Sequence, residues 1–585
     1  MDSQGESQDR DATSSLGEIL LSFIPNSGKT KSNPSTRRFS WQGFKALIAD
    51  TQIDDSLSKL MYIALLAALC GTGVLLLLNI EAKNVERHQY SVLLAVGFAI
   101  LLVIYRWSQN RLIESTARAV EDALDKKRQR TAGNLLSMSL SDAEALGRQR
   151  LQDGLSAQYA ALSQTIVPII SGVESIILLA FMFAYLVSLS VFAGAATIVV
   201  VGLTVVGYLG RSQQLEDEMQ RAASSEERLR TLSTSIANGY KELRLNSALR
   251  RGFEQETRGA SSAVSQGRTA SAKHFADLIS TGTSIAYLLA GVVVFVMPIF
   301  QQQSSGEDVS RIVVAVIFIL GPISSIVQTV QQFSTAQFAV AAINDFEATV
   351  SAFAKGANSH EAEAADCQLD ISSDLSINLN GVSYRHAQSE FLLKPINLEL
   401  KSGHVTFITG GNGSGKTTLL RVLCGLYPRQ EGNISVNGSP IPCITPQCYR
   451  DMFASVFADF HLFDKPYGLN EEQIFKFEMW TERLKIRHKL GDDITAISTD
   501  NLSTGQRKRV ALARALAEQR PVLVLDEWAA DQDPETRQYF YEELIPELKQ
   551  AGTTLLIITH DERYFDLCDQ RVHLVEGAIK EEPVS

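Results

Sequence analysis

The residues best suited to chemistry lie in a glycine-rich stretch that ends in a lysine and two threonines. Residues 410–417 read Gly-Gly-Asn-Gly-Ser-Gly-Lys-Thr, which fits the P-loop pattern. Glycines there let backbone N–H groups approach phosphate oxygens, and the helix that follows points its N-terminus at the anion. Lys416 would supply charge to the outer phosphates and Thr417 a hydroxyl to Mg²⁺. The expected nucleotide-binding residues are Gly410, Gly411, Asn412, Gly413, Ser414, Gly415, Lys416, Thr417 and Thr418.

Two further motifs place carboxylates and a histidine at the ends of apolar runs. Residues 522–525 are followed by Asp526 and Glu527, and the run 555–559 ends at His560. Parallel strands present their carboxyl ends at one edge of a sheet, where these side chains would meet the phosphates. Asp526 would reach Mg²⁺, Glu527 would hold the attacking water as general base and His560 would contact the γ-phosphate.

Between these motifs, Leu-Ser-Thr-Gly-Gln at 502–506 resembles the signature of ATP-binding-cassette (ABC) proteins. Each motif alone is commonly structural, but the four in this order within one αβ-patterned stretch predict a chain that binds and hydrolyses ATP. The resemblance implies that the signature closes over ATP held by the P-loop of a second copy, so that a homodimer forms. The residues implied at that shared interface are Ser503, Gly505, Gln506 and the D-loop residue Asp533.

The Q-loop departs from the general ABC pattern. Its expected glutamine is replaced by Ala458, which has no side-chain group to ligate Mg²⁺ or hold water. Asp459 and His461 are the neighbours that would compensate. A degenerate site that does not hydrolyse ATP is therefore an alternative, and the expected catalytic set argues against it. That set is Lys416, Asp526, Glu527 and His560.

The aromatic residue expected to stack on adenine falls at His386, two residues after Tyr384. Alternate residues of a strand lie on the same face, so either ring is a candidate. A histidine would stack more weakly and with pH dependence, because its charge changes near neutral pH. The sequence leaves both Tyr384 and His386 open.

A more apolar region precedes these motifs. Of the 585 residues, 45% are hydrophobic, and a helix needs about 20 apolar residues to cross a bilayer. The fold class expected is an all-α six-helix transmembrane domain followed by an α/β P-loop nucleotide-binding domain. The six runs are 60–80, 90–105, 166–186, 181–209 with a polar break near Ser188 and Ser190, 278–300 and 312–330.

Basic residues set the expected orientation. Lysine and arginine gather in 106–150 and 211–273, whereas the connection 301–308 is poor in them. By the positive-inside rule, both basic segments and both termini are expected to lie in the cytoplasm. The composition of the two segments favours helix. Short transverse helices, which ABC exporters dock on their cassettes, are expected near 138–145 and 237–245.

The composition also divides the chain. Residues 1–50 are expected to be a cytoplasmic tail, disordered at its start and with an amphipathic segment on the membrane surface. Residues 51–345 would form the transmembrane domain, 346–370 a linker and 371–585 the cassette. The six cysteines show no metal-ligand spacing, and cytosolic thiols stay reduced. A net charge of −11 argues against a nucleic-acid partner, while basic residues near the membrane suit anionic lipid.

Longer segments narrow the resemblance. Residues 457–464, 502–509 and 526–535 resemble the bacterial cyclic-peptide exporter family of ABC half-transporters, as do 239–246 and 321–324. The resemblance implies ATP-driven export of a cyclic peptide, lipopeptide or peptide-siderophore precursor across the inner membrane by a homodimer. The alternatives are an ATP-gated binding or channel-like protein of the ABC family, or an exporter of another amphipathic small molecule.

Polar side chains within apolar helices are the candidates for contact with cargo. Ionisable groups at membrane depth are functional by default. Glu174 lies well inside its apolar run, whereas Asp277 lies near a membrane edge, where simple solvation explains it equally well. The expected substrate-site residues are Glu174, Asp277, Gln328, Gln331 and Gln332.

Overall fold

The computed structural model divides into two compact units. The helical unit is Met1–Leu112 with Gly172–Val340, and the cassette unit is Ile113–Ser171 with Ala341–Ser585. The expected boundaries therefore differ for residues 113–171, which group with the cassette because they pack on it. The expected tail at 1–50 lies outside the described residues. These are 54–86, 88, 91–209, 212–296, 306–363, 375–386, 391–443, 445–491, 493, 494, 497 and 502–580.

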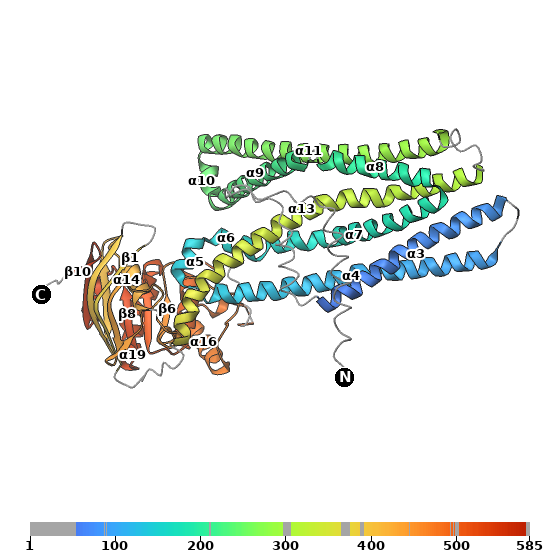
Figure 1. Ribbon diagram of the computed structural model, residues 1–585. Coiled ribbons are helices and arrows are strands. Elements are labelled where there is room, and N and C mark those ends of the chain that lie inside the picture. The colour runs from blue at the N-terminus through green and yellow to red at the C-terminus, as the bar shows by residue number, and fades with distance from the viewer. Residues whose placement is uncertain are drawn as a thin grey trace, which may run out of the picture. The chain divides into compact units, whose positions relative to one another are not determined.

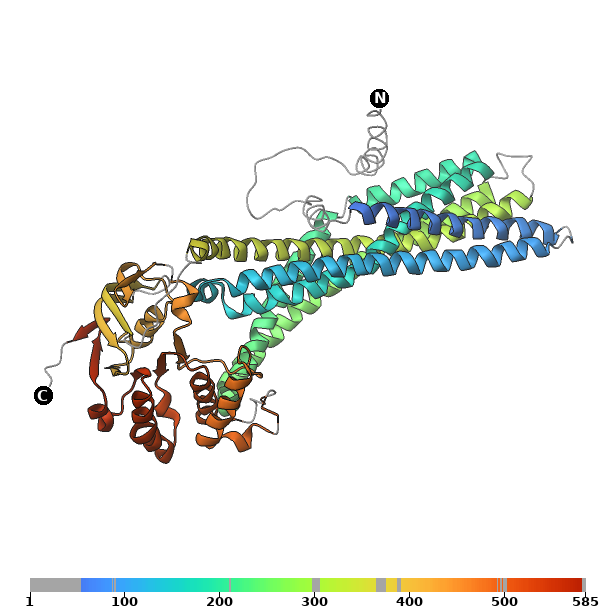
Figure 2. The same ribbon diagram turned by 90° about the horizontal axis from the view of Figure 1, so that it is seen from below.

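Long α-helices make up the helical unit (Figures 1 and 2). The boundary between the units falls within three of them, α4, α7 and α13. The helices are α3 (Asp54–Glu86), α4 (Val92–Leu136), α7 (Ala157–Leu189), α8 (Val191–Leu209), α9 (Ser212–Asn238), α10 (Tyr240–Leu245), α11 (Ser247–Gly291), which continues into the π-helical η1 (Val292–Val296), and α13 (Gly306–Glu363).

Small residues let neighbouring helices of this unit approach closely. Helices α3 and α4 lie side by side in both views (Figures 1 and 2), and a Cβ on Gly73 would come within 3.2 Å of Leu101. A Cβ on Gly172 of α7 would lie 2.0 Å from the Thr329 hydroxyl of α13, so no larger side chain fits there. Small residues at helix contacts are the usual packing device inside membranes.

Among the described residues, four helical stretches are long and apolar enough to cross a membrane: Lys59–Glu81, Val92–Leu136, Arg150–Leu189 and Arg311–Ala354. They coincide with four of the predicted runs. The other two runs coincide with α8 and with the end of α11 and η1. The overlapping runs are separate helices because the chain breaks at Ser190, whose hydroxyl accepts a hydrogen bond from the Ala193 N–H.

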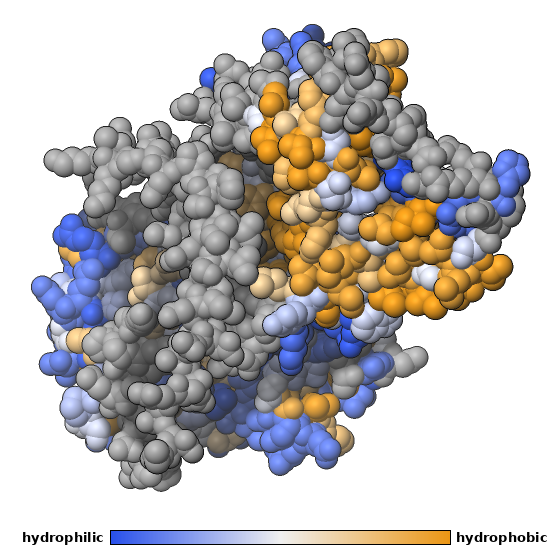
Figure 3. Space-filling model, turned by 45° about the vertical axis from the view of Figure 1, so that its right-hand side comes forward, coloured by the Kyte–Doolittle hydropathy of each residue, from blue (hydrophilic) through white to orange (hydrophobic). Residues whose placement is uncertain are grey.

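Large apolar side chains on these helices are exposed. Val92 and Leu93, at the start of α4, are 79% and 81% exposed. Figure 3 shows hydrophobic residues gathered over one part of the surface. An exposed apolar surface of this kind marks contact with a membrane or a protein partner. Together with their length, it identifies these helices as membrane spans.

The expected linker at 346–370 is helical in its first part. Helix α13 continues to Glu363, so residues 346–363 of the expected linker are helical. Alanine and glutamate are frequent there and favour helix, and composition alone does not separate a polar helix from a linker. Residues 364–370 lie outside the described residues.

Two short helices of the cassette unit lie between α4 and α7 in the chain. Helix α5 (Leu140–Leu146) begins at Ser139, whose hydroxyl accepts from the Asp142 N–H, and α6 (Arg148–Leu155) follows it. Leu146 packs with Phe346 and Val350 of α13. The short helix predicted near 138–145 is therefore confirmed as α5, and the one predicted near 237–245 corresponds to α10.

A six-stranded sheet forms the centre of the cassette unit. Its order is β10-β9-β3-β8-β7-β6, and its pairs are parallel except for β10 with β9. Every residue of β3, β7 and β8 is buried, which is why these strands read as continuous apolar runs. The strands are β3 (Val405–Gly410), β6 (Phe453–Val456), β7 (Val522–Asp526), β8 (Thr554–Ile558), β9 (Gln570–Val575) and β10 (Ala578–Lys580).

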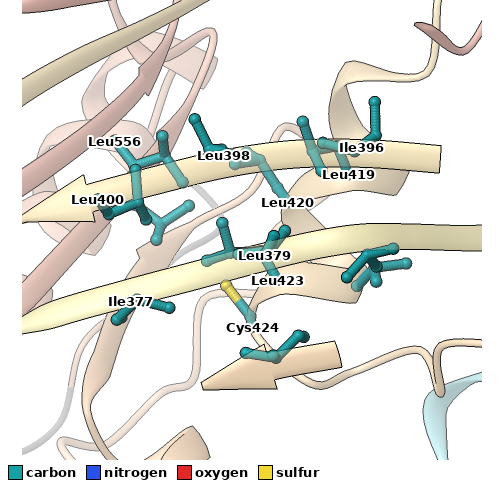
Figure 4. Close-up of a cluster of buried hydrophobic side chains, with 14 of the residues drawn as sticks. Ile377, Leu379, Ile396, Leu398, Leu400, Leu419, Leu420, Leu423, Cys424 and Leu556 are labelled. Atoms are coloured by element: carbon teal, nitrogen blue, oxygen red, sulfur yellow. The ribbon is translucent and has the colours of Figure 1, made fainter. Parts of the chain in front are cut away.

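A four-stranded antiparallel sheet contributes to a second core, which anchors the helix after the P-loop. Its order is β2-β1-β4-β5. In Figure 4, Leu419, Leu420 and Leu423 of helix α14 lie among side chains of β1 and β2. Burying this face of α14 fixes the start of the helix, where Lys416 lies. The elements are β1 (Ser376–Arg385), β2 (Leu392–Lys401), β4 (Glu431–Val436), β5 (Ser439–Ile441) and α14 (Lys416–Leu423).

Shorter helices cover the rest of the cassette unit. Two of them carry motif residues, since α17 begins directly after Ser503 and α18 directly after Asp533. They are α15 (Gln447–Arg450), α16 (Glu471–Arg483), η2 (Arg487–Lys489), α17 (Thr504–Ala517), η3 (Trp528–Asp531), α18 (Pro534–Tyr539), η4 (Phe540–Leu544), α19 (Ile545–Gln550) and η5 (Glu562–Leu567).

The cysteines within the described residues follow the sequence expectation except at one position. Cys70, Cys424, Cys443 and Cys568 are free thiols. Cys448 is disulfide-bonded, so the expectation of reduced thiols was wrong at this position. That expectation came from the cellular compartment and carried no information about which sulfur atoms lie close together.

Candidate active site

The P-loop turns from the end of β3 into α14 with glycines where a side chain does not fit. Gly410 has φ 142°, and a Cβ on it would lie 2.3 Å from the Leu574 carbonyl oxygen. Gly415, directly before α14, has φ 102°, in the left-handed region that favours glycine. Within the described part of the chain the buried Ser414 hydroxyl has no hydrogen-bond partner. A loop with an unpaired buried hydroxyl at a helix N-terminus suits a phosphate.

Lys416 turns back onto its own loop. Its Nζ donates to the carbonyl oxygens of Gly410 at 2.9 Å and Gly411 at 3.1 Å, and the residue is buried. Hydrogen bonds from an ammonium to charged oxygens are about twice as strong as those between neutral groups. ATP phosphates would therefore replace these carbonyls as partners of Lys416.

The expected Mg²⁺ ligands meet directly. Thr417 Oγ1, in the first turn of α14, donates to Oδ2 of Asp526, at the end of β7, at 3.0 Å. Burial raises the pKa of Asp526, while hydrogen bonds from Thr417 and the Ala458 backbone oppose the rise. Hydroxyl and carboxylate oxygens are ligands that Mg²⁺ takes together with phosphates. Within the described ranges no three His, Cys, Asp or Glu side chains cluster as a metal site.

The structure also brings Glu527 and His560 together. Strands β7 and β8 pair in parallel with Asp526 opposite Ile558, so the residues after both strands emerge at one edge. His560 Nε2 lies 3.2 Å from Glu527 Oε1. Glu527 itself has φ 49° and ψ 39°, a left-handed conformation that is uncommon outside glycine. A carboxylate paired with an imidazole beside Asp526 has the composition of a water-activating site.

The signature residues form the start of α17, and the N-terminus of this helix is capped. Ser503 Oγ accepts from the Gln506 N–H at 3.3 Å, and Gln506 Oε1 accepts from the Ser503 N–H at 3.0 Å. This reciprocal pair is a capping box. Gln506, expected at the nucleotide interface, thus uses its side-chain oxygen within its own helix. Ser503 and the start of the helix remain exposed, with a positive dipole end that favours an anion.

The D-loop residue Asp533 caps the next helix. Its carboxylate accepts from the Thr536 N–H and hydroxyl, both at 2.9 Å, and pairs with Arg509 of α17. Hydrogen bonding to the Thr536 backbone and the pairing with Arg509 hold the pKa of Asp533 below its usual range. Asp533 is therefore ionised and ordered within its own chain.

The two adenine candidates differ in access. Tyr384 is 5% exposed and stacks on Tyr427, with ring centroids 4.9 Å apart and planes 12° apart. His386 is half-buried and edge-on to both tyrosines, so it is the more accessible of the two rings. Strand β1 ends at Arg385, so His386 lies beyond the strand whose alternation was expected to place both rings on one face.

At the Q-loop, Asp459 and His461 make different contacts. Asp459 Oδ2 accepts from Arg421 at 2.7 Å, whereas His461 packs edge-on against Phe463 with centroids 4.9 Å apart. Ala458 contributes through its backbone, which hydrogen-bonds Asp526. Asp459 is therefore the neighbour that connects the Q-loop to the P-loop helix.

Sequence reasoning missed a polar cluster around Arg421. Arg421 of α14 donates to Glu144 Oε1 of α5 at 3.1 Å, and the Tyr427 hydroxyl donates to Glu144 Oε2 at 2.6 Å. Burial and the hydrogen bond to Glu144 raise the pKa of Tyr427 to about 12, so its hydroxyl stays a donor at neutral pH. The only sequence signal was the expected docking helix near 138–145, which did not indicate its partners.

The expected cargo residues that the structure describes differ in burial. Glu174 is buried and accepts from Gln109 Nε2 at 3.4 Å, within the helical unit. Asp277 and Gln328 are exposed, and Gln332 is half-buried. The side chain of Gln331 lies outside what the structure describes.

A Glu527→Gln variant tests the role of the carboxylate. Gln keeps the shape and loses the base, so ATP hydrolysis should fall about 10²- to 10⁴-fold, with ATP affinity unchanged. Steady-state turnover and equilibrium ATP binding measure the two effects. Glu562→Gln, the same change at an exposed glutamate of η5, is the matched control. Wild-type turnover in Glu527→Gln would remove this residue from the base role.

Comparison with known proteins agrees with this site. A family model described as ABC transporter matches residues 393–530. The ATP-binding protein SyrD of Pseudomonas syringae pv. syringae is 31% identical over 544 residues, which are 88% of this chain and 92% of that protein. The colicin V secretion/processing ATP-binding protein CvaB of Escherichia coli is 31% identical over 234 residues, 37% of this chain and 32% of that protein.

A solved structure shares the fold. A bacterial Atm1-family ABC exporter with ATP bound has a TM-score of 0.68 and 18% identity, covering 90% of this chain and 95% of that one. The similarity to SyrD extends through nearly the full length of both chains. The chain therefore belongs to the ABC transporter family, as an exporter of the bacterial group that its motifs resemble, with an ATPase coupled to transport.

Proposed function

We propose that the chain works as a homodimer that exports a cyclic peptide, lipopeptide or peptide-siderophore precursor across the bacterial inner membrane, with both termini in the cytoplasm. The observation that carries this is a hydrolytic site at one sheet edge in a chain that also has long apolar helices. The peptide class is supported by the resemblance of residues 526–535. One relative is named for the secretion of colicin V, which is compatible with secreted cargo.

The site residues divide the work of hydrolysis. Mg²⁺, when bound, neutralises phosphate charge, and Thr417 and Asp526 are the residues that would hold it. Lys416 exchanges its loop carbonyls for the outer phosphates. Glu527 orients the attacking water and takes its proton. His560, which is hydrogen-bonded to Glu527, keeps the Glu527 carboxylate near the γ-phosphate.

A second copy completes the nucleotide site. The chain has one P-loop and one signature, and the start of α17 is exposed and free to meet a phosphate. The cassette unit also exposes the aromatic side chains of Phe463 and Tyr467, which contact each other, and of Phe475 in α16. Exposed apolar groups of this kind mark a protein contact. Helix α10 buries none of its residues and exposes Tyr240 and Leu245, which makes the α10 of a second copy a suitable occupant.

The Arg421 cluster supports coupling between ATP and α5. Arg421 belongs to the P-loop helix, Asp459 to the Q-loop and Glu144 to α5, so one guanidinium joins all three segments. The side chain of Arg421 is 17% exposed, whereas those of Glu144 and Asp459 are 37% and 68% exposed, so water reaches the acceptor side of both bonds. Movement of the Q-loop on ATP binding would pull on Asp459 and through Arg421 on Glu144. Asp459 thus takes over the connection that Ala458 lacks.

Glu174 remains the first candidate for contact with cargo. A carboxylate facing lipid at the centre of a helix costs roughly 2.5 to 3.5 kcal/mol on the insertion scale. Its bond with Gln109 directs it into the helical unit and leaves one carboxylate oxygen for a polar cargo group. Asp277, Gln328 and Gln331 stay secondary candidates.

Transport by the purified protein in liposomes tests the proposed function. With cassettes facing outward and ATP outside, a labelled cyclic lipopeptide should accumulate in the vesicles and stimulate ATP hydrolysis. Liposomes carrying Glu527→Gln, which should bind ATP without turnover, are the matched control. Ion conductance on ATP addition without accumulation would establish the channel-like alternative. Accumulation of other amphipathic compounds but no peptide would overturn the cargo class alone.

Mixed dimers test the shared site. Pairing a Ser503→Arg protomer with a Lys416→Ala protomer leaves one site with both lesions and one with neither. Differently tagged protomers, purified by both tags in sequence, should bind more ATP than either parent homodimer. Equal binding in all three would contradict a site built from two chains.

Glu144→Gln tests the Arg421 cluster. The change keeps the shape and weakens a charged hydrogen-bonded contact, which is worth about 1.5 to 3 kcal/mol, and the low end applies because the Glu144 side chain is 37% exposed. We expect basal ATPase to persist while cargo transported per ATP falls. Glu114→Gln, which breaks an exposed pair with Arg118 in α4, is the control. An unchanged transport ratio in Glu144→Gln would exclude this contact from coupling.

A further inference from the structure

The signature helix α17 buries a charged side chain, that of Lys508. Lys508 of α17 is 3% exposed although it carries a charge. Its Nζ donates to the Glu527 carbonyl oxygen at 2.7 Å and pairs with Asp531 Oδ2 at 2.8 Å. A buried ammonium is costly unless it is paired and hydrogen-bonded, so these two acceptors determine where it lies. Both acceptors belong to the segment directly after β7.

One of these acceptors is the backbone of the proposed base. Glu527 is left-handed at φ 49°, ψ 39°, and both its backbone groups are held. Its N–H donates to the Ile558 carbonyl at 3.1 Å, and its carbonyl accepts from Lys508 at 2.7 Å and from the Ala530 N–H at 3.4 Å. Strained conformations persist only where the surroundings fix them. The bond from Lys508 is the shorter of the two at the carbonyl and the one made by a charged side chain, so it contributes most to holding the turn that directs the Glu527 carboxylate toward His560.

Other contacts join α17 to the same segment. Trp528 is fully buried, and its Nε1 donates to the Lys508 carbonyl at 2.8 Å. Gln532 accepts from Arg509 at 2.8 Å and donates to the Gly505 carbonyl at 3.2 Å. A Cβ on Gly505 would lie 2.5 Å from the Asp531 carbonyl oxygen. The first turns of α17 and residues 527–533 form one packed block.

We propose that Lys508 is a positioning residue for Glu527, acting on its backbone rather than on substrate. This inference rests on the proposed role of Glu527 as base. The block also gives the two sites of a homodimer a mechanical link. In the proposed dimer, the start of α17 contacts the ATP that is held by the second copy. Lys508, in the second turn of the same helix, orients Glu527, which acts on the ATP held by its own copy.

Lys508→Met removes the ammonium and keeps a buried chain of similar length. We expect kcat for ATP to fall about 10- to 100-fold, less than the loss of the base itself, with KM for ATP nearly unchanged. The Hill coefficient for ATP should also fall. Asp531→Asn is the matched control, because it neutralises the other partner and leaves the Lys508–Glu527 bond; its kcat should stay close to wild type.

A double-mutant cycle separates positioning from a merely structural role. If Lys508 acts through Glu527, adding Lys508→Met to Glu527→Gln should not lower residual turnover further. An additive loss, or equal losses in Lys508→Met and Asp531→Asn, would overturn the proposal. If Lys508→Met does not fold, as judged by thermal unfolding and ATP binding, Lys508→Gln enters the same cycle with the same two outcomes.

The cycle also distinguishes the positioning role of Lys508 from the proposed role of Glu527 as base. Wild-type turnover in Glu527→Gln would overturn the base role, and with it the reason for positioning. An inactive Glu527→Gln together with a fully active Lys508→Met would overturn the role of Lys508 alone.

Discussion

The burial of three parallel strands on both faces is the constraint on which the nucleotide site depends. Strands β3, β7 and β8 have no exposed residue, so charged side chains appear only where these strands end. Parallel direction brings those ends to one edge. The direction of the strands is therefore enough to bring the P-loop, the two carboxylates and the histidine to the same edge. The antiparallel sheet holds the helix that starts at Lys416 against this edge.

Much of this arrangement was predictable from the sequence, because it follows from strand ends and fixed motifs. The meeting of Thr417 with Asp526 and of Glu527 with His560 is of this kind. Tyr384 was not predictable as a core residue, since an irregular register in β1 breaks strict alternation. The contact of Glu144 with Arg421 joins residues 277 positions apart, and no local pattern encodes such a pairing.

The helical unit shows the same division. Length and hydropathy predicted the spans and the break at Ser190, since the bilayer sets both. Hydropathy gives the depth of a polar residue and not its direction, so the partner of Glu174 had to come from the structure. Composition marked 346–370 as a linker, but polar helices and loops share their composition, and only the structure shows that α13 continues as helix to Glu363.

The capping box at Ser503 has a kinetic consequence. Because Gln506 and Ser503 already satisfy each other, the helix end is ordered before any second cassette arrives. The first N–H groups of a helix have no intrahelical acceptor and point outward. Association of two cassettes would then carry little ordering cost at this helix end. Differences in affinity between related complexes lie mostly in their dissociation rates. In the proposed dimer, the lifetime of the closed state of the two cassettes, rather than its rate of formation, would depend on whether the γ-phosphate of ATP has been hydrolysed.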